Sequence, residues 1–204
     1  MKEKKLKRVY CLMGYTAVGK STIAQRIVKD LKNVHLAVSH TTRPIRPKEV
    51  EGVDYHFIDN NEFREMKENY CFIETRSYNT KIVEDGETKD AVWNYGYARE
   101  EFENYEYCIA IVDVTGYEEL KEYFKPKGVI VTPIYVKVDE DVLKKRIEKR
   151  GDLLAEFERR LKDDKERFKK FRVNVVYKSI DNSDDDVQKA VDKLKTFIVG
   201  ESNE

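Results

Sequence analysis

A glycine-rich stretch near the N-terminus constrains this chain more than any other part of its sequence. Residues 14–21 read Gly14-Tyr-Thr-Ala-Val-Gly-Lys-Ser21 and match the pattern G-x4-G-K-[ST] in full. The apolar residues 9–13 before it are typical of a buried strand, and Ile23, Ile27 and Leu31 after it recur at helical spacing. Strand, glycine-rich loop and helix in this order bind the phosphates of a nucleoside triphosphate. The alternative, a chance glycine turn, does not account for the strand pattern before the loop or the helix pattern after it.

The chemistry of this phosphate loop (residues 14–21) assigns roles to its parts. Successive backbone N–H groups surround a polyphosphate, and the start of the next helix adds its positive dipole end. Lys20 is expected to reach the β- and γ-phosphates, and the Ser21 hydroxyl to ligate Mg²⁺. The candidate triphosphate ligands are Gly14, Tyr15, Thr16, Ala17, Val18, Gly19, Lys20, Ser21 and Thr22.

Composition limits the range of partners. Lys plus Arg and Asp plus Glu both total 39, so the formal net charge is zero, which argues against non-specific nucleic-acid binding. Cys11, Cys71 and Cys108 stand in apolar surroundings and are expected to be buried thiols of a reducing compartment. No apolar run approaches the roughly 18 residues of a membrane span. Basic residues before the apolar run that begins at Val9 imitate a signal peptide, but cleavage after that run would destroy the phosphate loop, so a cytoplasmic location is expected.

Strand and helix patterns alternate toward both ends of the chain, which indicates an α/β fold with a parallel sheet. Strands are predicted near residues 8–13, 35–38, 107–114, 129–137 and 174–177, and helices near 19–33, 117–124, 140–150, 154–171 and 184–198. The strands near 107–114 and 129–137 are almost continuously apolar, as in strands covered on both faces. Pro133 indicates that the second of these is an edge strand or ends early.

The middle of the chain, residues 39–105, has a different character. It is rich in tyrosine, and its predicted strands are short. Asp85-Gly86 between two candidate strands predicts a hairpin. This section is interpreted as a second lobe inserted into the α/β core.

Anion-binding side chains are concentrated in the acceptor segment (residues 39–55), just after the second predicted core strand. Arg43 and Arg46 are each followed by a proline and offer rigid bidentate forks for a phosphate. Tyr55 adds a neutral donor. A stiff surface loop with solvated arginines is the alternative interpretation.

The acceptor segment resembles the nucleotide-acceptor motif of guanylate kinases, and with the phosphate loop the chain resembles that family over most of its length. The resemblance implies that ATP, with Mg²⁺, phosphorylates GMP to GDP. It implies a P-loop parallel-sheet core with helices on both faces, an inserted small mixed α/β lobe that binds the nucleoside monophosphate, and a helical lid. These parts are placed at residues 1–38, 106–139 and 170–204 for the core, 39–105 for the lobe and 140–169 for the lid.

The resemblance also implies which residues bind GMP: Ser39, Arg43, Arg46, Tyr55, Glu74, Tyr95 and Asp113. The two arginines and two tyrosines would hold the phosphate. Glu74 would read guanine, because one carboxylate accepts both N1–H and N2–H₂, whereas adenine has an acceptor at N1. Ser39 would donate to guanine O6, and Asp113 would contact guanine or order a water on Mg²⁺.

The predicted helices near 140–150 and 154–171 are similar to the family's lid. Arg146, Arg150 and Arg160 would join Lys20 as catalytic groups that neutralise charge on the transferring phosphoryl group. Arg146 and Arg150 share one helical face. Helices that pair these arginines with nearby glutamates are the alternative.

The chain departs from the family pattern in three places. Tyr97 stands where the family has a hydroxyl residue after Tyr-Gly, and Ile111 stands where it has an acid. An insertion at about residues 79–90 separates Glu74 from Tyr95 and is interpreted as a longer hairpin.

These departures keep other functions open. One is a related kinase with a different or deoxy nucleotide acceptor, and another is a non-catalytic guanylate-kinase-like binding module, although the intact phosphate loop argues against a module. The sequence from Asp113 to Gly116 also spells the D-x-x-G of GTPases, but no Asn-Lys-x-Asp motif accompanies it.

Overall fold

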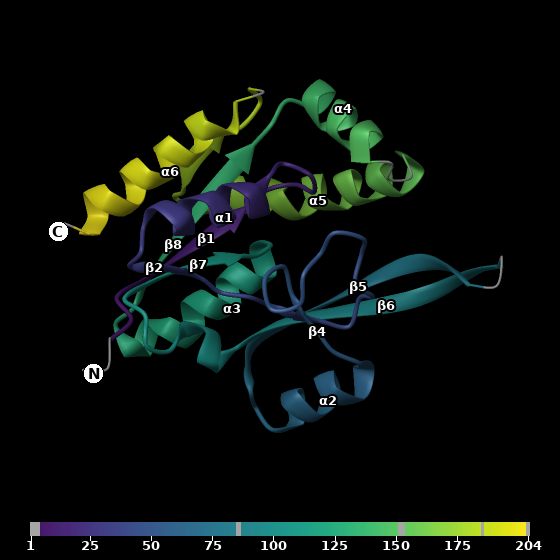
Figure 1. The fold of residues 1–204 in the computed structure, drawn as a ribbon, viewed down its shortest axis with the longest axis horizontal. Helices are drawn as coiled ribbons and strands as arrows, with labels where there is room; N and C mark the ends of the chain where they lie inside the picture. The colour runs from purple at the N-terminus through teal and green to yellow at the C-terminus, as the bar shows by residue number, and fades with distance from the viewer. Residues whose placement is uncertain (1–4, 85–86, 151–153, 185, 203–204) are drawn as a thin grey trace.

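The computed structural model describes residues 5–84, 87–150, 154–184 and 186–202. Their centre is a five-stranded parallel sheet of order β2-β7-β1-β8-β9 (Figure 1). The strands are β2 (Val34–Leu36), β7 (Tyr107–Ile111), β1 (Arg8–Met13), β8 (Ile130–Lys137) and β9 (Lys178–Asp181). Because β1 lies between β7 and β8, the phosphate loop that follows it emerges at the middle of the carboxyl edge.

Side chains of β1 alternate between the two faces of this sheet, as the strand period requires. Tyr10 and Leu12 pack with α1 (Lys20–Asp30), α4 (Glu140–Arg150) and α6 (Val187–Ser202). Cys11 and Met13 pack on the other face with α3 (Val114–Phe124) and the later turns of α5 (Leu154–Asn174). Helices therefore cover both faces, which confirms the predicted α/β fold (Figure 1).

A second sheet, of order β4-β3-β6-β5, is formed by the middle of the chain. The strands β3 (His40–Thr41) and β4 (His56–Phe57) are short, and α2 (Asn60–Glu68) follows them. The strands β5 (Phe72–Glu84) and β6 (Glu87–Ala98) form a long antiparallel hairpin that projects from the core (Figure 1). The expectation of short strands is thus wrong for β5 and β6, because the extra residues near 79–90 lengthen both.

The predicted hairpin is confirmed by its strand pairing. Glu84 pairs with Glu87 across the connection, while the turn residues Asp85 and Gly86 lie outside the described residues. The short helix η1 (Arg99–Phe102) lies between β6 and β7, and the short helix η2 (Lys125–Lys127) lies between α3 and β8.

The interpretation of Pro133 is wrong, because β8 is an internal strand that neither lies at the edge nor ends early. It pairs with β1 on one side and β9 on the other. However, the pairing of β9 with β8 begins at Ile134, one residue after Pro133. The missing N–H of proline therefore costs no hydrogen bond to β9.

Several other boundaries differ from the sequence prediction by a few residues. The strand expected at 174–177 lies at 178–181, because α5 continues to Asn174. Strand β7 ends at Ile111, and Asp113 caps α3 by accepting a hydrogen bond from the N–H of Gly116 at 3.0 Å.

The cysteines differ in burial. Cys11 and Cys108 are buried as expected, whereas Cys71 is partly exposed.

Within the described residues, no helix is both long enough and apolar enough to cross a bilayer.

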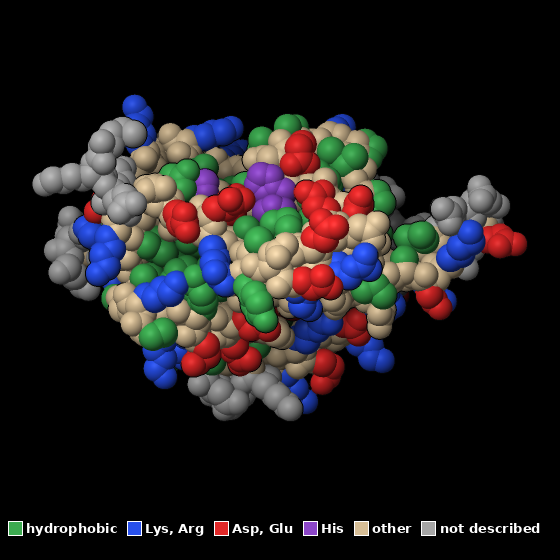
Figure 2. Space-filling view, turned by 90° about the horizontal axis from the view of Figure 1, so that it is seen from below, with side chains coloured by type: hydrophobic (Ala, Val, Ile, Leu, Met, Phe, Trp, Pro, Cys, Tyr) green, Lys and Arg blue, Asp and Glu red, His purple; other side chains and the backbone are tan. Residues whose placement is uncertain are grey.

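All three histidines of the chain gather where the central sheet passes into the second sheet. Glu101 lies between two of them, 3.5 Å from Nε2 of His35 and 3.1 Å from Nε2 of His56. The His40 and His56 rings lie 4.6 Å apart. Figure 2 shows histidine side chains beside acidic groups on this face of the molecule.

This histidine cluster predicts a pH-dependent stability. Burial, and then the neighbouring His56, lower the pKa of His40 to about 4, against about 6.5 in an unfolded chain. Between these values only the unfolded chain binds the proton, so stability is lost as the pH falls from about 6.5 to 4. We expect His40→Gln to remove about 2 kcal/mol of the difference between pH 7 and pH 5 in urea unfolding. His35→Gln is the control, and an equally steep loss in the His40 variant would contradict the assignment.

Candidate active site

A cavity of about 1020 Å³ opens between the two sheets and α5. It is lined by the phosphate loop, the acceptor segment, the β5–β6 hairpin and residues of α4 and α5. Most of the predicted site residues line it together: Gly14, Thr16, Ala17, Gly19, Lys20, Ser21, Thr22, Ser39, Arg43, Arg46, Tyr55, Tyr95, Asp113, Arg146 and Arg160. Tyr15, Val18 and Glu74 do not line it. The side chain of Arg150 lies outside the described part of the chain.

The glycines of the phosphate loop are required by close contacts and by backbone geometry. Gly14 has a φ of +142°, and a Cβ there would stand 2.3 Å from the carbonyl oxygen of Val136. Gly19 has a φ of +91°, and its Cβ would stand 2.6 Å from Nδ2 of Asn182. Side chains at either position would push β8 or the segment after β9 away from the loop.

Lys20 is directed back into the phosphate loop. Its Nζ donates to the carbonyl oxygens of Gly14 and Tyr15, each at 2.8 Å. Burial lowers the pKa of Lys20 to about 8, although Asp164 and Asp113 favour its charged form. A partly buried cation whose hydrogen bonds to described residues go to neutral oxygens is well placed to bind an anion.

Two residues that sequence reasoning missed hold the phosphate loop. Oδ2 of Asp164, on α5, accepts a hydrogen bond from the backbone N–H of Thr16 at 2.7 Å. Nδ2 of Asn182, after β9, donates to the carbonyl oxygen of Val18 at 2.8 Å. Both lie more than 140 residues from the loop in sequence, and no sequence signal marks them.

Arg43 is held by a bidentate ion pair in the acceptor segment. Its Nη1 and Nη2 donate to the two carboxylate oxygens of Glu49 at 3.0 and 2.8 Å. The guanidinium also lies 5.2 Å from the centre of the Tyr55 ring. The Tyr55 ring contacts that of Tyr95 edge to face at 5.8 Å, so these tyrosines and the arginine form one wall of the cavity.

Arg46 has no comparable counter-ion. Its backbone N–H donates to Glu49 at 2.8 Å, but its guanidinium has no hydrogen bond or ion pair with another described residue. Burial, followed by the positive charges of Arg43 and Arg160, lowers the pKa of Arg46. This concentration of positive charge is unfavourable by itself and favours a bound anion.

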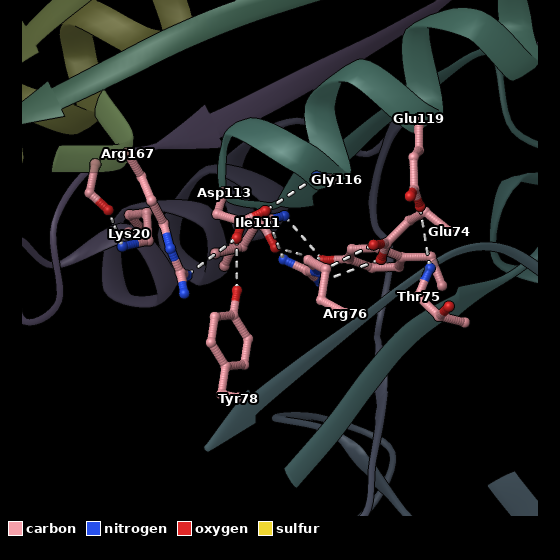
Figure 3. A network of polar contacts seen from close by, with 12 residues as sticks. Lys20, Glu74, Thr75, Arg76, Tyr78, Ile111, Asp113, Gly116, Glu119 and Arg167 are labelled. Carbon is pink, nitrogen blue, oxygen red and sulfur yellow. Dashed lines mark hydrogen bonds and ion pairs between the residues drawn. The ribbon is translucent and has the colours of Figure 1, made fainter. Parts of the chain in front are cut away.

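Asp113 joins the hairpin to α5 at the other end of the cavity (Figure 3). The Tyr78 hydroxyl donates to Oδ2 of Asp113 at 2.7 Å, and Nη1 of Arg167 lies 3.5 Å from the same oxygen. The Arg167 guanidinium also lies 5.0 Å from the centre of the Tyr78 ring. Neither Tyr78 nor Arg167 was predicted as a site residue.

Glu74 is bound to Arg76, two residues further along β5 (Figure 3). Nη2 of Arg76 donates to Oε1 of Glu74 at 3.1 Å, and Nε lies 2.9 Å from Oε2 without a hydrogen-bonding angle. The Glu74 side chain is fully buried, and burial raises its pKa to about 7 against the effect of Arg76. Residues i and i+2 share a face of a strand, so this spacing is the signal that would have identified Arg76.

Two departures from the family pattern meet in one contact. The hydroxyl of Tyr97 accepts a hydrogen bond from the N–H of Ile111 at 2.8 Å and donates to its carbonyl oxygen at 3.2 Å. The large side chain at position 97 thus bonds to the strand end where Ile111 replaces an acid. Tyr97 is buried, and Arg76 lies 5.9 Å from the centre of its ring.

The predicted lid arginines have separate surroundings. Nη2 of Arg146 donates to the carbonyl oxygen of Asn182 at 2.7 Å, beside the phosphate loop. The guanidinium of Arg160 lies 5.9 Å from the centre of the Trp93 ring, on the lengthened hairpin. Trp93 is the single tryptophan of the chain and lines the cavity, but the sequence prediction did not include it.

Comparisons with known proteins agree in pointing to one family. A sequence profile of the family described as "Guanylate kinase" matches residues 6–201. A guanylate kinase of Helicobacter hepaticus is 31% identical over 156 residues, which cover 75% of this chain and 72% of the relative. A guanylate kinase of Oceanobacillus iheyensis is 30% identical over 202 residues, which cover 95% and 87%. The crystal structure of guanylate kinase from Anaplasma phagocytophilum shares the fold, with a TM-score of 0.66, 21% identity and coverage of 98% and 88%.

Proposed function

Because the chain belongs to the guanylate kinase family, we propose that it transfers the γ-phosphoryl group of ATP to GMP and forms ADP and GDP. The observation that carries this proposal is that Lys20 and the Arg43–Arg46 pair line one cavity. A triphosphate on the phosphate loop and a monophosphate on the two arginines would face each other there. Such placement is the main requirement for phosphoryl transfer, which needs no covalent enzyme intermediate.

The donor end is formed by the phosphate loop. Its backbone N–H groups would surround the ATP phosphates, with Lys20 exchanging the carbonyl oxygens of Gly14 and Tyr15 for phosphate oxygens. These carbonyls keep the ammonium group bonded until a nucleotide arrives. The remaining loop positions, Thr16 to Thr22, complete the proposed ATP site.

The acceptor end is formed by Arg43, Arg46, Tyr55 and Tyr95, which would hold the GMP phosphate. A phosphate at neutral pH is already largely ionised, so the acceptor oxygen needs no strong general base. Buried guanidinium groups bind a phosphate more strongly than solvated ones, because water competes less.

Charge on the transferring group would be neutralised by Lys20 together with lid arginines. Arg146 lies beside the phosphate loop and Arg160 beside the acceptor arginines, so the two approach the cavity from opposite ends. We assign the same role to Arg150 on the family resemblance alone. Closure of the lid (140–169) and the acceptor lobe (39–105) over the core would exclude water and limit hydrolysis of ATP.

Guanylate kinases generally use ATP together with Mg²⁺. The cavity offers oxygen donors that suit this ion, the Ser21 hydroxyl at the start of α1 and the Asp113 carboxylate. The described residues contain no cluster of three or more His, Cys, Asp or Glu side chains that would hold an ion alone. Mg²⁺ is therefore proposed to bind through Ser21, phosphate oxygens and water, and to neutralise phosphate charge.

An acceptor panel tests the proposed function. ADP release is measured with ATP and, in turn, GMP, dGMP, AMP, CMP and UMP. We expect strong preference for a guanine nucleotide. Equal use of AMP would favour the alternative of a kinase with another acceptor. Hydrolysis of ATP or GTP without formation of a phosphorylated acceptor would contradict the transferase function. Absence of nucleotide binding would favour a non-catalytic module.

Asp164 is expected to weaken ATP binding. Its carboxylate occupies the Thr16 N–H that a phosphate oxygen would need, and it places negative charge at the loop. We expect Asp164→Ala to bind ATP about tenfold more tightly, which corresponds to one charge-assisted hydrogen bond. The measurement is an ATP titration followed by the fluorescence of Trp93. Asp163→Ala removes the same charge one residue away and is the control, while weaker binding by the Asp164 variant would contradict this role.

A further inference from the structure

The β5–β6 hairpin arranges its cavity-facing side chains in cross-strand rows. Residues directly opposite each other on a sheet point to the same face. Glu74 pairs with Tyr97, Arg76 with Tyr95, and Tyr78 with Trp93. Both members of the second and third pairs line the cavity, whereas in the first, buried pair Tyr97 lines it and Glu74 does not. The polar group that the hairpin presents next to the phosphate-binding Tyr95 is therefore Arg76.

Glu74 faces α3 and, unlike Arg76, does not line the cavity. Its Oε2 lies 3.1 Å from where a Cβ of Gly116 would stand, so a side chain there would crowd it. Both of its oxygens contact the guanidinium of Arg76. To read a base, this carboxylate would have to leave a buried ion pair and leave Arg76 without its counter-ion, which is costly.

Arg76 keeps one edge of its guanidinium available. Nε and Nη2 contact Glu74, whereas Nη1 makes no hydrogen bond with any described residue. The nearest charge recorded for Nη1 is Oδ1 of Asp113 at 4.0 Å, beyond hydrogen-bonding distance. The Nη1–Nη2 edge is a two-pronged donor, and Glu74 fixes its direction.

We propose that Arg76 is the residue that reads the base, by donating from this edge to O6 and N7 of guanine, with Glu74 as its positioning counter-ion. This inference rests on the proposed function. Guanine presents two neighbouring acceptors, O6 and N7, and a guanidinium pairs with both. Adenine presents an amino group beside N7, which leaves one donor of Arg76 facing another donor. Guanine is thus selected through the edge opposite to the one a carboxylate would read.

The two modes of reading respond differently to altered bases. Inosine 5′-monophosphate keeps O6 and N7 but lacks the 2-amino group. The 7-deaza analogue of GMP keeps N1–H and the 2-amino group but has a C–H in place of N7. Reading by Arg76 makes the analogue a poor ligand and leaves inosine 5′-monophosphate a good one, whereas reading by a carboxylate reverses the order.

Dissociation constants of GMP and these two nucleotides, followed by Trp93 fluorescence on the wild-type chain, provide the first test. We expect inosine 5′-monophosphate to bind within about fivefold of GMP, and 7-deaza-GMP to bind about 10- to 100-fold more weakly. Equal binding of GMP and 7-deaza-GMP overturns the proposal while leaving the kinase intact. Tighter binding of GMP than of 7-deaza-GMP, without formation of ADP in the kinase assay, would support the role of Arg76 and contradict the proposed kinase activity.

Variants at Arg76 provide the second test. In Arg76→Met the ratio of the 7-deaza-GMP and GMP dissociation constants is expected to fall to about one, because the partner of N7 is gone. A loss of binding through misfolding would weaken both ligands and keep their ratio. Lys81→Met removes a positive charge from an exposed position of the same strand and should retain the wild-type ratio. An Arg76 variant that keeps the full N7 preference overturns the proposal.

Discussion

Replacing Lys20 by methionine is expected to reduce phosphoryl transfer at least about 10³-fold with every acceptor. The side chain is partly buried in the phosphate loop, and its hydrogen bonds to described residues go to backbone carbonyl oxygens, so its charge is available to phosphate oxygens. Methionine fills similar space without the charge. Because the lost interaction strengthens in the transition state, the fall appears in kcat as well as in kcat/KM.

The pH dependence gives the Lys20 prediction a second readout. Burial lowers the pKa of Lys20 to about 8, so the side chain loses its charge as the pH rises through 8 in the free protein. We therefore expect kcat/KM for ATP to fall above about pH 8, since this parameter reports the free enzyme. An arginine at position 20 stays charged and should remove this alkaline limb, whatever its effect on the rate.

The control for Lys20 is Lys29, an exposed lysine near the end of the same helix. Lys29→Met removes an equal charge and should retain near wild-type turnover. Thermal unfolding of both variants separates lost chemistry from lost structure. Substantial turnover by a folded Lys20→Met protein would contradict the role of the phosphate loop as the donor site.

Replacing Arg46 by methionine is expected to raise KM for GMP about 10²-fold. A charge-assisted bidentate contact with the phosphate would be lost, and each such hydrogen bond contributes about 1.5–3 kcal/mol. The expected effect of this substitution on stability is different. Arg46 is repelled by Arg43 and Arg160 and has its pKa lowered by burial and by both of them. Its removal should therefore leave the free energy of unfolding unchanged or raise it.

Urea unfolding and steady-state kinetics on one preparation test both parts of the Arg46 prediction. The control is Arg64→Met on α2, where the guanidinium is exposed and donates to Asn61. It should change neither KM nor stability by a measurable amount. A marked loss of stability in Arg46→Met, with KM for GMP unaltered, would mean that Arg46 supports the fold and does not bind the acceptor.

Contiguous sequence was sufficient wherever a feature is formed by neighbouring residues. The phosphate loop was predictable because two glycines, a lysine and a serine at set spacing determine the backbone path of one turn. The alternation of apolar strands and helices likewise predicted the parallel sheet, since each pattern reflects the period of its own element. The Asp-Gly pair predicted the hairpin for the same reason.

Strand pairing and long-range contacts determined what the sequence alone could not. Pro133 was misjudged because its tolerance depends on where β9 begins to pair with β8. Asp164 reaches the Thr16 N–H only because α5 packs across the carboxyl edge of the sheet. Neither fact has a local sequence pattern, since both depend on partners far along the chain.

Glu74 and Arg76 illustrate most clearly the difference between what local sequence predicts and what tertiary contacts decide. A short motif identified Glu74 as a polar residue of interest, and the strand period places Arg76 on the same face. The burial of Glu74 and its pairing with Arg76 follow from the packing of β5 against α3, which brings Gly116 close to the carboxylate. Sequence by itself identified the groups that are proposed to bind phosphate, because those groups belong to continuous turns. Tertiary structure decided that Glu74 is buried and occupies one edge of the Arg76 guanidinium, because this burial arises only when separate elements meet.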